Sequence, residues 1–268
     1  MKKTLMISAI MAAFVMQLSA QLNTKWNGKS CAVVLTYDDA ISQHLDNALP
    51  VLDSLNLKAT FYITASSPTC SLRMNEWKHA AKEGHELGNH TLYHPCLGGT
   101  PGREWVRKEY DLNNYTVQRM IDEIRMTNTF LEALDGKKKR TFAFTCGDMK
   151  IGDSSFIECL KNEFVAARGV RSVLNQLPNI NLYNVDCYGV NGESAEQMIE
   201  WVKQAKATGS LLVILFHGVE GGNYLNVSLA AHSQLLHYLK QEEKDIWIAP
   251  MVEVAEYIKQ YQLQHKNN

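Results

Sequence analysis

Cys31-Ala32-Val33-Val34-Leu35-Thr36-Tyr37-Asp38-Asp39 is a short apolar run that ends in two adjacent carboxylates. Such a run, without helical periodicity, is typical of a β-strand. Similar runs recur along the chain and alternate with segments of helical periodicity. Strands that alternate with helices indicate parallel βαβ units, so the sequence predicts an α/β protein.

The alternation predicts eight strands, over residues 31–36, 59–64, 85–89, 140–145, 164–168, 182–187, 211–217 and 246–249. Seven or eight βα units in about 248 residues favour a closed or nearly closed barrel over an open sheet. No linker, charge block or internal repeat interrupts the pattern. We therefore expect one domain over residues 21–268.

Residues 1–20 have the pattern of a secretory signal peptide. Lys2 and Lys3 give a positive start, an apolar segment follows, and cleavage is expected after Ala20. The apolar segment is too short to favour a spanning helix, so we expect no stable membrane insertion after cleavage. The pattern predicts export to a bacterial periplasm or to the outside of the cell.

The net charge of −1 argues against nucleic acid or an anionic membrane as the main partner, since both select basic surfaces. The six cysteines show no C-x-x-C spacing, which excludes a zinc ribbon or a thioredoxin motif. We expect mostly buried thiols and one or two disulfides, whose pairing stays open. No nucleotide-binding glycine motif is present, so no organic cofactor is expected.

Two histidines four residues apart, His90 and His94, follow the predicted strand 85–89. On one turn of helix, both rings would share a face and could bind one ion. With a carboxylate from Asp38 or Asp39 they make a three-ligand site, and the other aspartate would be free to act as a base. Alone, an Asp-Asp pair is more often a helix cap. Together the residues indicate metal-assisted hydrolysis.

Two further titratable residues end predicted strands. His217 follows the most apolar strand and could donate a proton to a leaving group, although a lone histidine is more often structural. Asp186 could accept a ring N–H from His217 and orient it, although a role as a cap or turn residue fits equally well.

These segments, in this order, resemble the polysaccharide deacetylase family (the NodB homology domain, carbohydrate esterase family 4). Three of its motifs, Thr-Phe-Asp-Asp-Gly, His-Ser/Thr-x-x-His and Leu-x-His, are matched by Thr36-Tyr37-Asp38-Asp39-Ala40, His90-Thr91-Leu92-Tyr93-His94 and Leu215-Phe216-His217. The resemblance covers roughly residues 31–217. It implies a distorted (β/α)7 barrel that removes acetyl groups from N- or O-acetylated saccharides.

By position, Asp38 resembles the catalytic base of that family and His217 its catalytic acid. Asp39, His90 and His94 resemble its metal ligands. The resemblance implies that metal and base activate water while the acid protonates the leaving group. Zinc is the default ion for two histidines and an aspartate, though cobalt, nickel or manganese would fit the same ligands.

Two of the family's motifs are altered in this chain. The third normally reads Arg-x-Pro, and its arginine orders the base, but Ala143 and Thr145 stand here. Arg168, at the end of a predicted strand, is the expected replacement. The fourth motif, at Asp186, normally has a tryptophan nearby, and Tyr188 is the aromatic candidate here. Two cysteines are also expected near the site, where a thiolate could become a ligand, namely Cys146 and Cys187.

The glycine-rich segment 95–111 follows the histidine pair and carries Trp105 and Tyr110. It is either a loop that contacts substrate or a solvated loop whose aromatic residues pack down. An open groove there would favour a glycan, and a lid would favour a hydrolase of the C–N bond of a small amide. A non-catalytic glycan-binding protein with a vestigial site is the third hypothesis. The sequence leaves the glycan, the choice between N- and O-acetyl, and the oligomeric state open.

Overall fold

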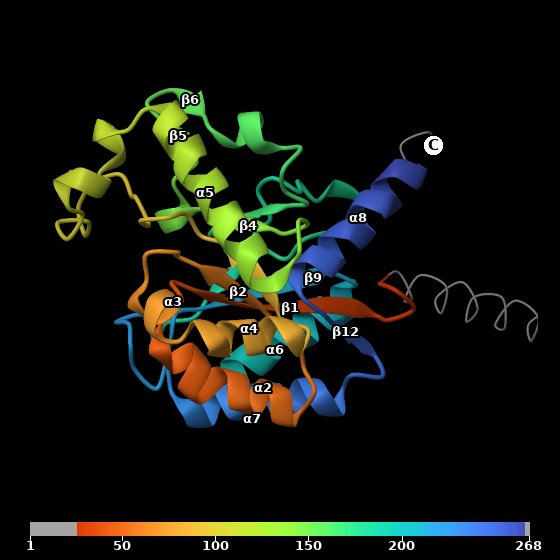
Figure 1. Ribbon diagram of the computed structural model, residues 1–268. Coiled ribbons are helices and arrows are strands. Elements are labelled where there is room, and N and C mark those ends of the chain that lie inside the picture. Colours follow the sequence, from red (N-terminus) through yellow and green to blue (C-terminus); the bar gives the residue numbers. More distant parts are fainter. Residues whose placement is uncertain (1–25, 266–268) are drawn as a thin grey trace, which may run out of the picture.

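The computed structural model describes residues 26–265, so the signal peptide predicted at residues 1–20 lies outside the described residues. A mainly parallel sheet of eight strands, in the order β7-β4-β3-β2-β1-β9-β8 with β12 also paired to β1, forms the centre of the molecule (Figure 1). Its strands are β1 (Cys31–Asp38), β2 (Thr60–Ile63), β3 (Glu86–Asn89), β4 (Phe142–Ala143), β7 (Ala167–Arg168), β8 (Tyr188–Gly189), β9 (Leu211–Phe216) and β12 (Ile246–Ile248).

The central strand, β1, is buried along its whole length. It pairs with β9 on one side, and on the other with β12 near its start and with β2 near its end. Its side chains alternate between two apolar clusters, with Val33 and Leu35 in one and Ala32 and Val34 in the other. A strand that is covered on both faces needs the continuous apolar run seen in the sequence.

The two ends of the sheet approach each other. At the end of β7, Arg168 forms a parallel bridge with Val185, whose N–H donates to the Ala167 carbonyl at 2.9 Å. The chain then continues into β8, which pairs with β9. The sheet therefore curls into a distorted barrel, which confirms the predicted fold class and single domain.

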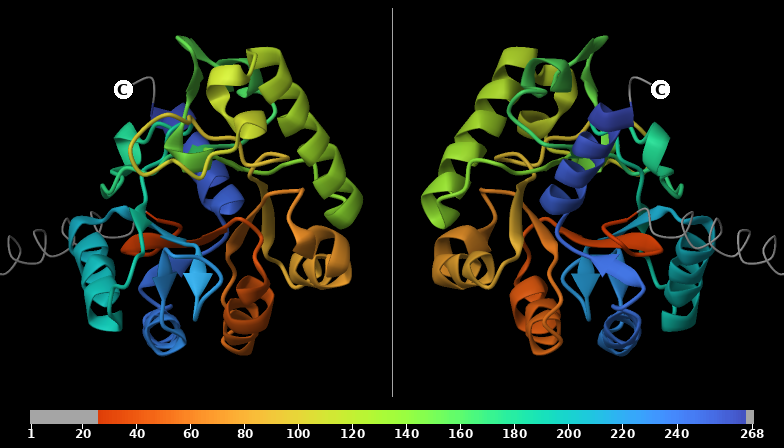
Figure 2. Two further views of the ribbon diagram at one scale, coloured as in Figure 1. Left: turned by 90° about the vertical axis from the view of Figure 1, so that its left-hand side faces the viewer. Right: turned by 90° about the vertical axis from the view of Figure 1, so that its right-hand side faces the viewer.

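Helices cover both sides of the sheet (Figures 1 and 2). Helices α2, α4, α6 and α7 lie along one face, and α5 and α8 lie on the other. The helices are η1 (His44–Ala48), α2 (Leu49–Ser54), α3 (Pro68–Leu72), α4 (Met74–Lys82), α5 (Val117–Asp135), α6 (Ala195–Thr208), α7 (Leu229–Gln241) and α8 (Met251–His265). No helix within residues 26–265 is long and apolar enough to cross a membrane.

Short elements complete the chain. Two small pairs of strands are β5 (Lys150–Ile151) with β6 (Ser154–Ser155) and β10 (Gly218–Val219) with β11 (Asn226–Val227). Single 3₁₀ turns are η2 (Lys108–Tyr110), η3 (Leu112–Asn114), η4 (Thr145–Gly147), η5 (Ile157–Leu160) and η6 (Leu177–Asn179). The strands predicted at 140–145 and 164–168 are shortened to the two residues of β4 and of β7, and the strand predicted at 182–187 is displaced to β8. The chain leaves the sheet early at these places and enters the short turns.

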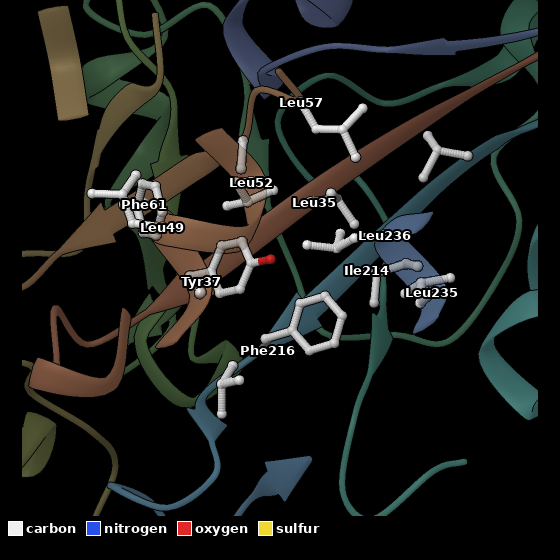
Figure 3. Packing of buried hydrophobic residues seen from close by; sticks show 14 of the residues in the cluster. Leu35, Tyr37, Leu49, Leu52, Leu57, Phe61, Ile214, Phe216, Leu235 and Leu236 are labelled. Carbon is white, nitrogen blue, oxygen red and sulfur yellow. The ribbon is translucent and has the colours of Figure 1, made fainter. Parts of the chain in front are cut away.

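An aromatic stack supports the end of β1 from beneath (Figure 3). The Tyr37 ring stacks between Phe61 of β2 and Phe216 of β9, with centroid distances of 5.0 and 5.2 Å. Its hydroxyl is hydrogen-bonded to Nε2 of His232 on α7 at 2.7 Å. This packing fixes the strand ends at which Asp38 and His217 emerge.

Candidate active site

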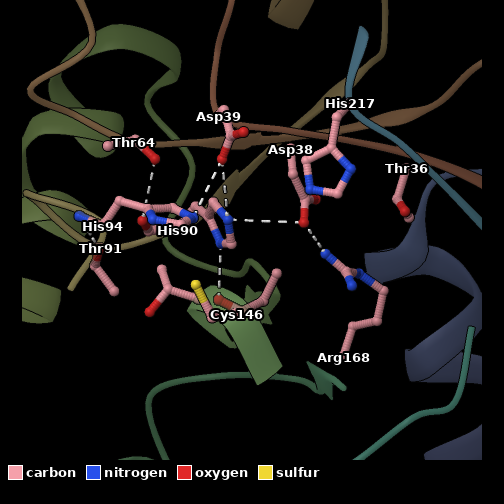
Figure 4. Close-up of polar contacts among 12 residues, drawn as sticks. Thr36, Asp38, Asp39, Thr64, His90, Thr91, His94, Cys146, Arg168 and His217 are labelled. Carbon is pink, nitrogen blue, oxygen red and sulfur yellow. Dashed lines mark hydrogen bonds and ion pairs between the residues drawn. The ribbon is translucent and has the colours of Figure 1, made fainter. Parts of the chain in front are cut away.

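The polar side chains singled out in the sequence gather at the carboxyl ends of the parallel strands (Figure 4). Asp38 ends β1, and Asp39 follows it. His90 follows β3, Arg168 ends β7 and His217 follows β9. Parallel strands present their carboxyl ends at one edge, which is where barrels build their active sites. Residues that are far apart in the sequence therefore share one site.

The structure brings together Asp39, His90 and His94, the residues expected from the sequence to bind a metal. Oδ1 of Asp39 lies 3.5 Å from Nε2 of His90 and 3.3 Å from Nε2 of His94. This buried oxygen has no hydrogen-bond partner among the described residues. The three donor atoms lie within 4.8 Å of one another. One carboxylate oxygen and two imidazole nitrogens of this kind fit a divalent cation.

The tautomer of His90 is fixed by its other ring nitrogen. Nδ1 lies 2.9 Å from the carbonyl oxygen of Ala143, which can only accept a hydrogen bond. Nδ1 therefore carries the hydrogen, and the Nε2 lone pair faces Asp39. A ring that donates to a carbonyl in this way is held in the orientation that a metal ligand needs.

The prediction that His90 and His94 share a helical turn was wrong. The segment is a loop in which Thr91 and His94 have φ values of 66° and 55°. The loop is closed by two hydrogen bonds, from Thr91 N to Oδ1 of Asn89 at 2.8 Å and from His94 N to Oγ1 of Thr91 at 2.9 Å. The two rings converge because this loop turns back on itself.

The Asp38 carboxylate is paired with a buried arginine. Arg168 is fully buried, and its guanidinium donates to Oδ2 of Asp38. Burial opposes ionisation of Asp38, but the charge of Arg168, followed by those of His90 and His217, outweighs it and lowers the pKa of this carboxyl. Asp38 is therefore ionised well below neutral pH.

Arg168 stands directly opposite the position that lacks the family's arginine. In the β4–β7 pairing, Ala143 is the cross-strand partner of Arg168. The arginine side chain therefore reaches Asp38 from the neighbouring strand, as the sequence suggested. The guanidinium also donates to the Gly169 carbonyl at 2.9 Å.

The altered third motif is bonded to the chain just after His94. Cys146 forms a disulfide with Cys96, two residues after His94. Oγ1 of Thr145 donates to the Pro95 carbonyl at 2.5 Å. The expectation that Cys146 could supply a thiolate ligand was therefore wrong, because its sulfur is in a disulfide. Cys187 is a buried thiol that donates to the Gly169 carbonyl, and burial raises its pKa.

His217 lies beside Asp38 in the site (Figure 4). Its carbonyl accepts a hydrogen bond from Nε2 of His44 at 2.8 Å, and its buried Nδ1 has no partner within residues 26–265. Of the two roles left open for Asp186, its contacts favour a structural one over orienting this ring. Both Asp186 oxygens instead accept from Arg171, at 2.9 and 2.7 Å, because the guanidinium fork matches a carboxylate in two places.

Two residues that the sequence reasoning missed contact the site. Asn223, between β10 and β11, donates from Nδ2 to Oδ2 of Asp39 at 3.2 Å. His44, at the start of η1, holds the backbone of His217. The glycine pair before Asn223 was a signal that the chain bends sharply there, but nothing in the sequence pointed to Asp39.

The segment 95–111 forms a closed loop beside His94. Its ends are joined by hydrogen bonds from Cys96 N to Tyr110 O and from Leu112 N to Cys96 O, both at 3.0 Å. The Trp105 side chain is 52% exposed, and its ring centroid lies 6.5 Å from that of His94. Trp105 therefore borders the site instead of packing down. Tyr188, the aromatic expected in the site, packs against Trp201 of α6 at 5.0 Å.

Sequence comparisons identify a family for the first half of the chain. Residues 25–155 match the family model described as polysaccharide deacetylase. The Bacillus subtilis protein YheN is 42% identical over 81 residues, which are 29% of this chain and 27% of YheN. The chain spans only a small part of the curated relatives that it matches, with 29%, 6% and 27% of their lengths covered.

Solved structures resemble the whole described fold. The peptidoglycan deacetylase PdaC from Bacillus subtilis matches with a TM-score of 0.56 and 16% identity, covering 88% of this chain and 96% of that chain. A mutant of BA3943, described as a pseudoenzyme of carbohydrate esterase family 4, matches with a TM-score of 0.53 and 16% identity, covering 84% and 67%. At this identity the likeness shows the fold, and the fold is shared by active and inactive proteins.

Proposed function

Because the chain belongs to the polysaccharide deacetylase family through its NodB homology domain, we propose that it is a metal-dependent hydrolase that removes acetyl groups from N- or O-acetylated carbohydrate. The observation that carries this proposal is the unpaired Oδ1 of Asp39 facing two histidine nitrogens, beside an ionised Asp38. A divalent ion on Asp39, His90 and His94 would polarise both a water molecule and the acyl oxygen. Zinc is the ion we propose, since the ligands are two histidines and one aspartate.

Asp38 is the proposed general base. Its Oδ2 is occupied by Arg168, whereas its buried Oδ1 has no partner in the described part of the chain. Oδ1 is therefore the atom that would take a proton from the attacking water. Arg168 keeps the carboxylate ionised and in place, which a base needs before it can act at neutral pH.

His217 is the proposed general acid. When the acyl–nitrogen or acyl–oxygen bond breaks, the departing amine or alcohol needs a proton, and the His217 ring is beside the base to supply it. The proton that Asp38 takes from water and the one that His217 gives to the leaving group would leave acetic acid and a free amine or hydroxyl as products. The acid ionises to acetate, and the cycle closes when Asp38 loses its proton and His217 regains one. Asp186 has no role in this scheme, since Arg171 holds it.

The alternatives are less well supported. Trp105 is half-exposed beside His94 and gives a flat ring on which a sugar could stack, so a saccharide suits the site better than a small amide. A vestigial site has no physical need to keep Asp38, its buried arginine and His217 together. The signal-peptide pattern of residues 1–20 supports export, where such a substrate would be met.

Acetate release from a panel of acetylated saccharides tests the proposal. The panel would hold chitooligosaccharides, peptidoglycan fragments and acetylated xylan, with zinc-loaded protein and its Asp38→Asn variant. Release that requires both zinc and Asp38 is the expected result, and the active substrate names the glycan. If zinc binds but no acetate appears from any of them, the deacetylase assignment is wrong.

A further inference from the structure

The turn after β1 holds Asp39 in an unusual backbone conformation. Asp39 and Ala40 have φ values of 83° and 52°, in the left-handed region that side chains disfavour. The turn is held because the Ala40 carbonyl accepts hydrogen bonds from Ser67 Oγ at 2.7 Å and Thr69 Oγ1 at 2.5 Å. The Asp39 backbone is therefore fixed, but these bonds leave the rotation of its carboxylate free.

The loop between β10 and β11 packs closely against this turn. Gly222 has a φ of 84°, and a Cβ atom on it would lie 2.2 Å from Oε1 of Gln43 and 2.8 Å from Cδ1 of Ile41, so this approach favours glycine. The start of the loop is tied to η1, since Nδ2 of Asn47 donates to the Val219 carbonyl at 2.7 Å. These contacts place Asn223, the next residue after Gly222, beside Asp39.

The orientation of the Asn223 amide follows from its two partners. Oδ1 accepts from the backbone N–H of Leu225 at 3.0 Å, and an N–H can only donate. The NH₂ group must therefore be the end that faces Oδ2 of Asp39, at 3.2 Å. With Oδ2 engaged, Oδ1 is the oxygen left to face His90 and His94.

We propose that Asn223 is a positioning residue that selects the Asp39 oxygen presented to a divalent cation. The inference rests on the metal site of the proposed function. The two aspartates have different hydrogen-bond donors: the donor to Asp38 is the cationic Arg168, and the donor to Asp39 is the neutral amide of Asn223. A neutral amide fixes the carboxylate while leaving its negative charge for the cation.

Zinc affinity of the full chain, measured by competition with a chromogenic chelator, tests this role. Asn223→Ala is expected to bind zinc 10- to 100-fold more weakly than the wild type, in the range typical of lost outer hydrogen bonds to metal ligands. The visible spectrum of the cobalt-loaded variant should also change, since it reports ligand geometry. Tyr224→Ala is the matched control, because the adjacent Tyr224 side chain is 78% exposed.

A second variant separates the amide from the loop. Oδ1 of Asn226 accepts from Gly221 N at 2.8 Å, so Asn226→Ala loosens the loop while keeping the Asn223 amide. It is expected to weaken zinc binding less than Asn223→Ala does. Equal losses in both variants, or unchanged affinity in Asn223→Ala, would overturn the proposal. A wild type that binds no zinc would refute the metal site itself and this inference with it.

Discussion

At the scale of single residues, the candidate active site differs from the polysaccharide deacetylase motifs that it resembles in which residue supplies the positive charge beside Asp38. The arginine that normally precedes the third motif's proline is Ala143 here, and Arg168 reaches Asp38 from the paired position on β7. A small side chain on β4 and a long one on β7 can exchange places across a strand pair, since side chains of paired residues on one face are neighbours.

Replacing Arg168 by Met should lower kcat/KM by roughly a hundred-fold, because Asp38, the proposed general base, would lose the partner that orders it, and a general base contributes about 10²–10⁴-fold. Burial raises the pKa of Asp38, and Arg168 is the largest influence that lowers it. Removing Arg168 should therefore move the acid limb of the pH–rate profile to higher pH. Arg125→Ala, which removes an exposed pair with Glu163, is the control.

The double variant Ala143→Arg with Arg168→Ala would return the arginine to the family's position. Partial recovery of activity and of the acid limb is expected, since the two positions are opposite each other. An unshifted pH profile in Arg168→Met would mean that Arg168 does not tune the base.

The Tyr37–His232 pair predicts a pH-dependent stability. Burial lowers the pKa of His232 to about 3, whereas an unfolded histidine titrates near about 6.5. As the pH falls below about 6.5 the unfolded chain takes up this proton first, so stability is lost by about 1.4 kcal/mol per pH unit for this one group until the folded pKa is reached. Urea unfolding between these pH values measures the slope.

The double variant Tyr37→Phe with His232→Leu is the comparison. It removes both polar partners, so the slope of its unfolding free energy against pH should be smaller by the contribution of one proton, about 1.4 kcal/mol per pH unit. Tyr37→Phe alone should cost about 1–3 kcal/mol, because it leaves Nε2 of His232 buried without a partner. Equal slopes in the wild type and the double variant would show that His232 does not titrate on unfolding.

At the scale of elements, a buried carboxylate connects four of them. Glu86 of β3 accepts from the backbone N–H of Thr141 at 2.7 Å, before β4, and from that of Val252 at 2.9 Å, in the first turn of α8. It also accepts from Oγ1 of Thr60 on β2 at 2.8 Å. These contacts tie the early strands to the last helix.

Glu86→Gln should destabilise the protein by about 1–3 kcal/mol. Each carboxylate oxygen faces one backbone N–H, so the amide NH₂ of glutamine must point at a donor in either orientation. Urea unfolding at neutral pH measures the loss, with the half-exposed Glu132→Gln as control. An unchanged midpoint would mean that the site relaxes at no cost.

Sequence patterns predicted the elements better than they predicted the loops between them. The ends of the strands at 31–36, 85–89 and 211–217 follow from apolar runs, so Asp38, Asp39, His90 and His217 could be placed at strand ends beforehand. The Cys96–Cys146 disulfide and the Asn223 contact could not, because each joins two loops whose conformation depends on the packed fold. The helix expected at His90–His94 failed for the same reason, since left-handed residues at Thr91 and His94 are set by loop hydrogen bonds.

At the scale of the whole molecule, a bound ion should stabilise the fold. An ion that binds only the folded state at 100 times its Kd contributes about 2.7 kcal/mol. For a protein of this size about 1 kcal/mol raises the melting temperature by about 2–4 °C. Calorimetry with zinc and after chelation should therefore show a rise of several degrees, and Asp39→Asn should abolish it. An identical melting temperature with and without zinc would contradict a folded-state metal site.

The order of the strands also decides where the protein can be divided. The segment that matches the family model ends at residue 155, but β7, β8, β9 and β12 lie beyond it, and two of them flank β1 in the middle of the sheet. A protein cut there would retain Asp39, His90 and His94, the proposed cation ligands, on a sheet with unpaired, aggregation-prone edges. It would lack both Arg168 and His217, the proposed acid. The proposed site therefore depends on strands from both halves of the chain, and domain shuffling could transfer it to another protein only by moving the whole barrel.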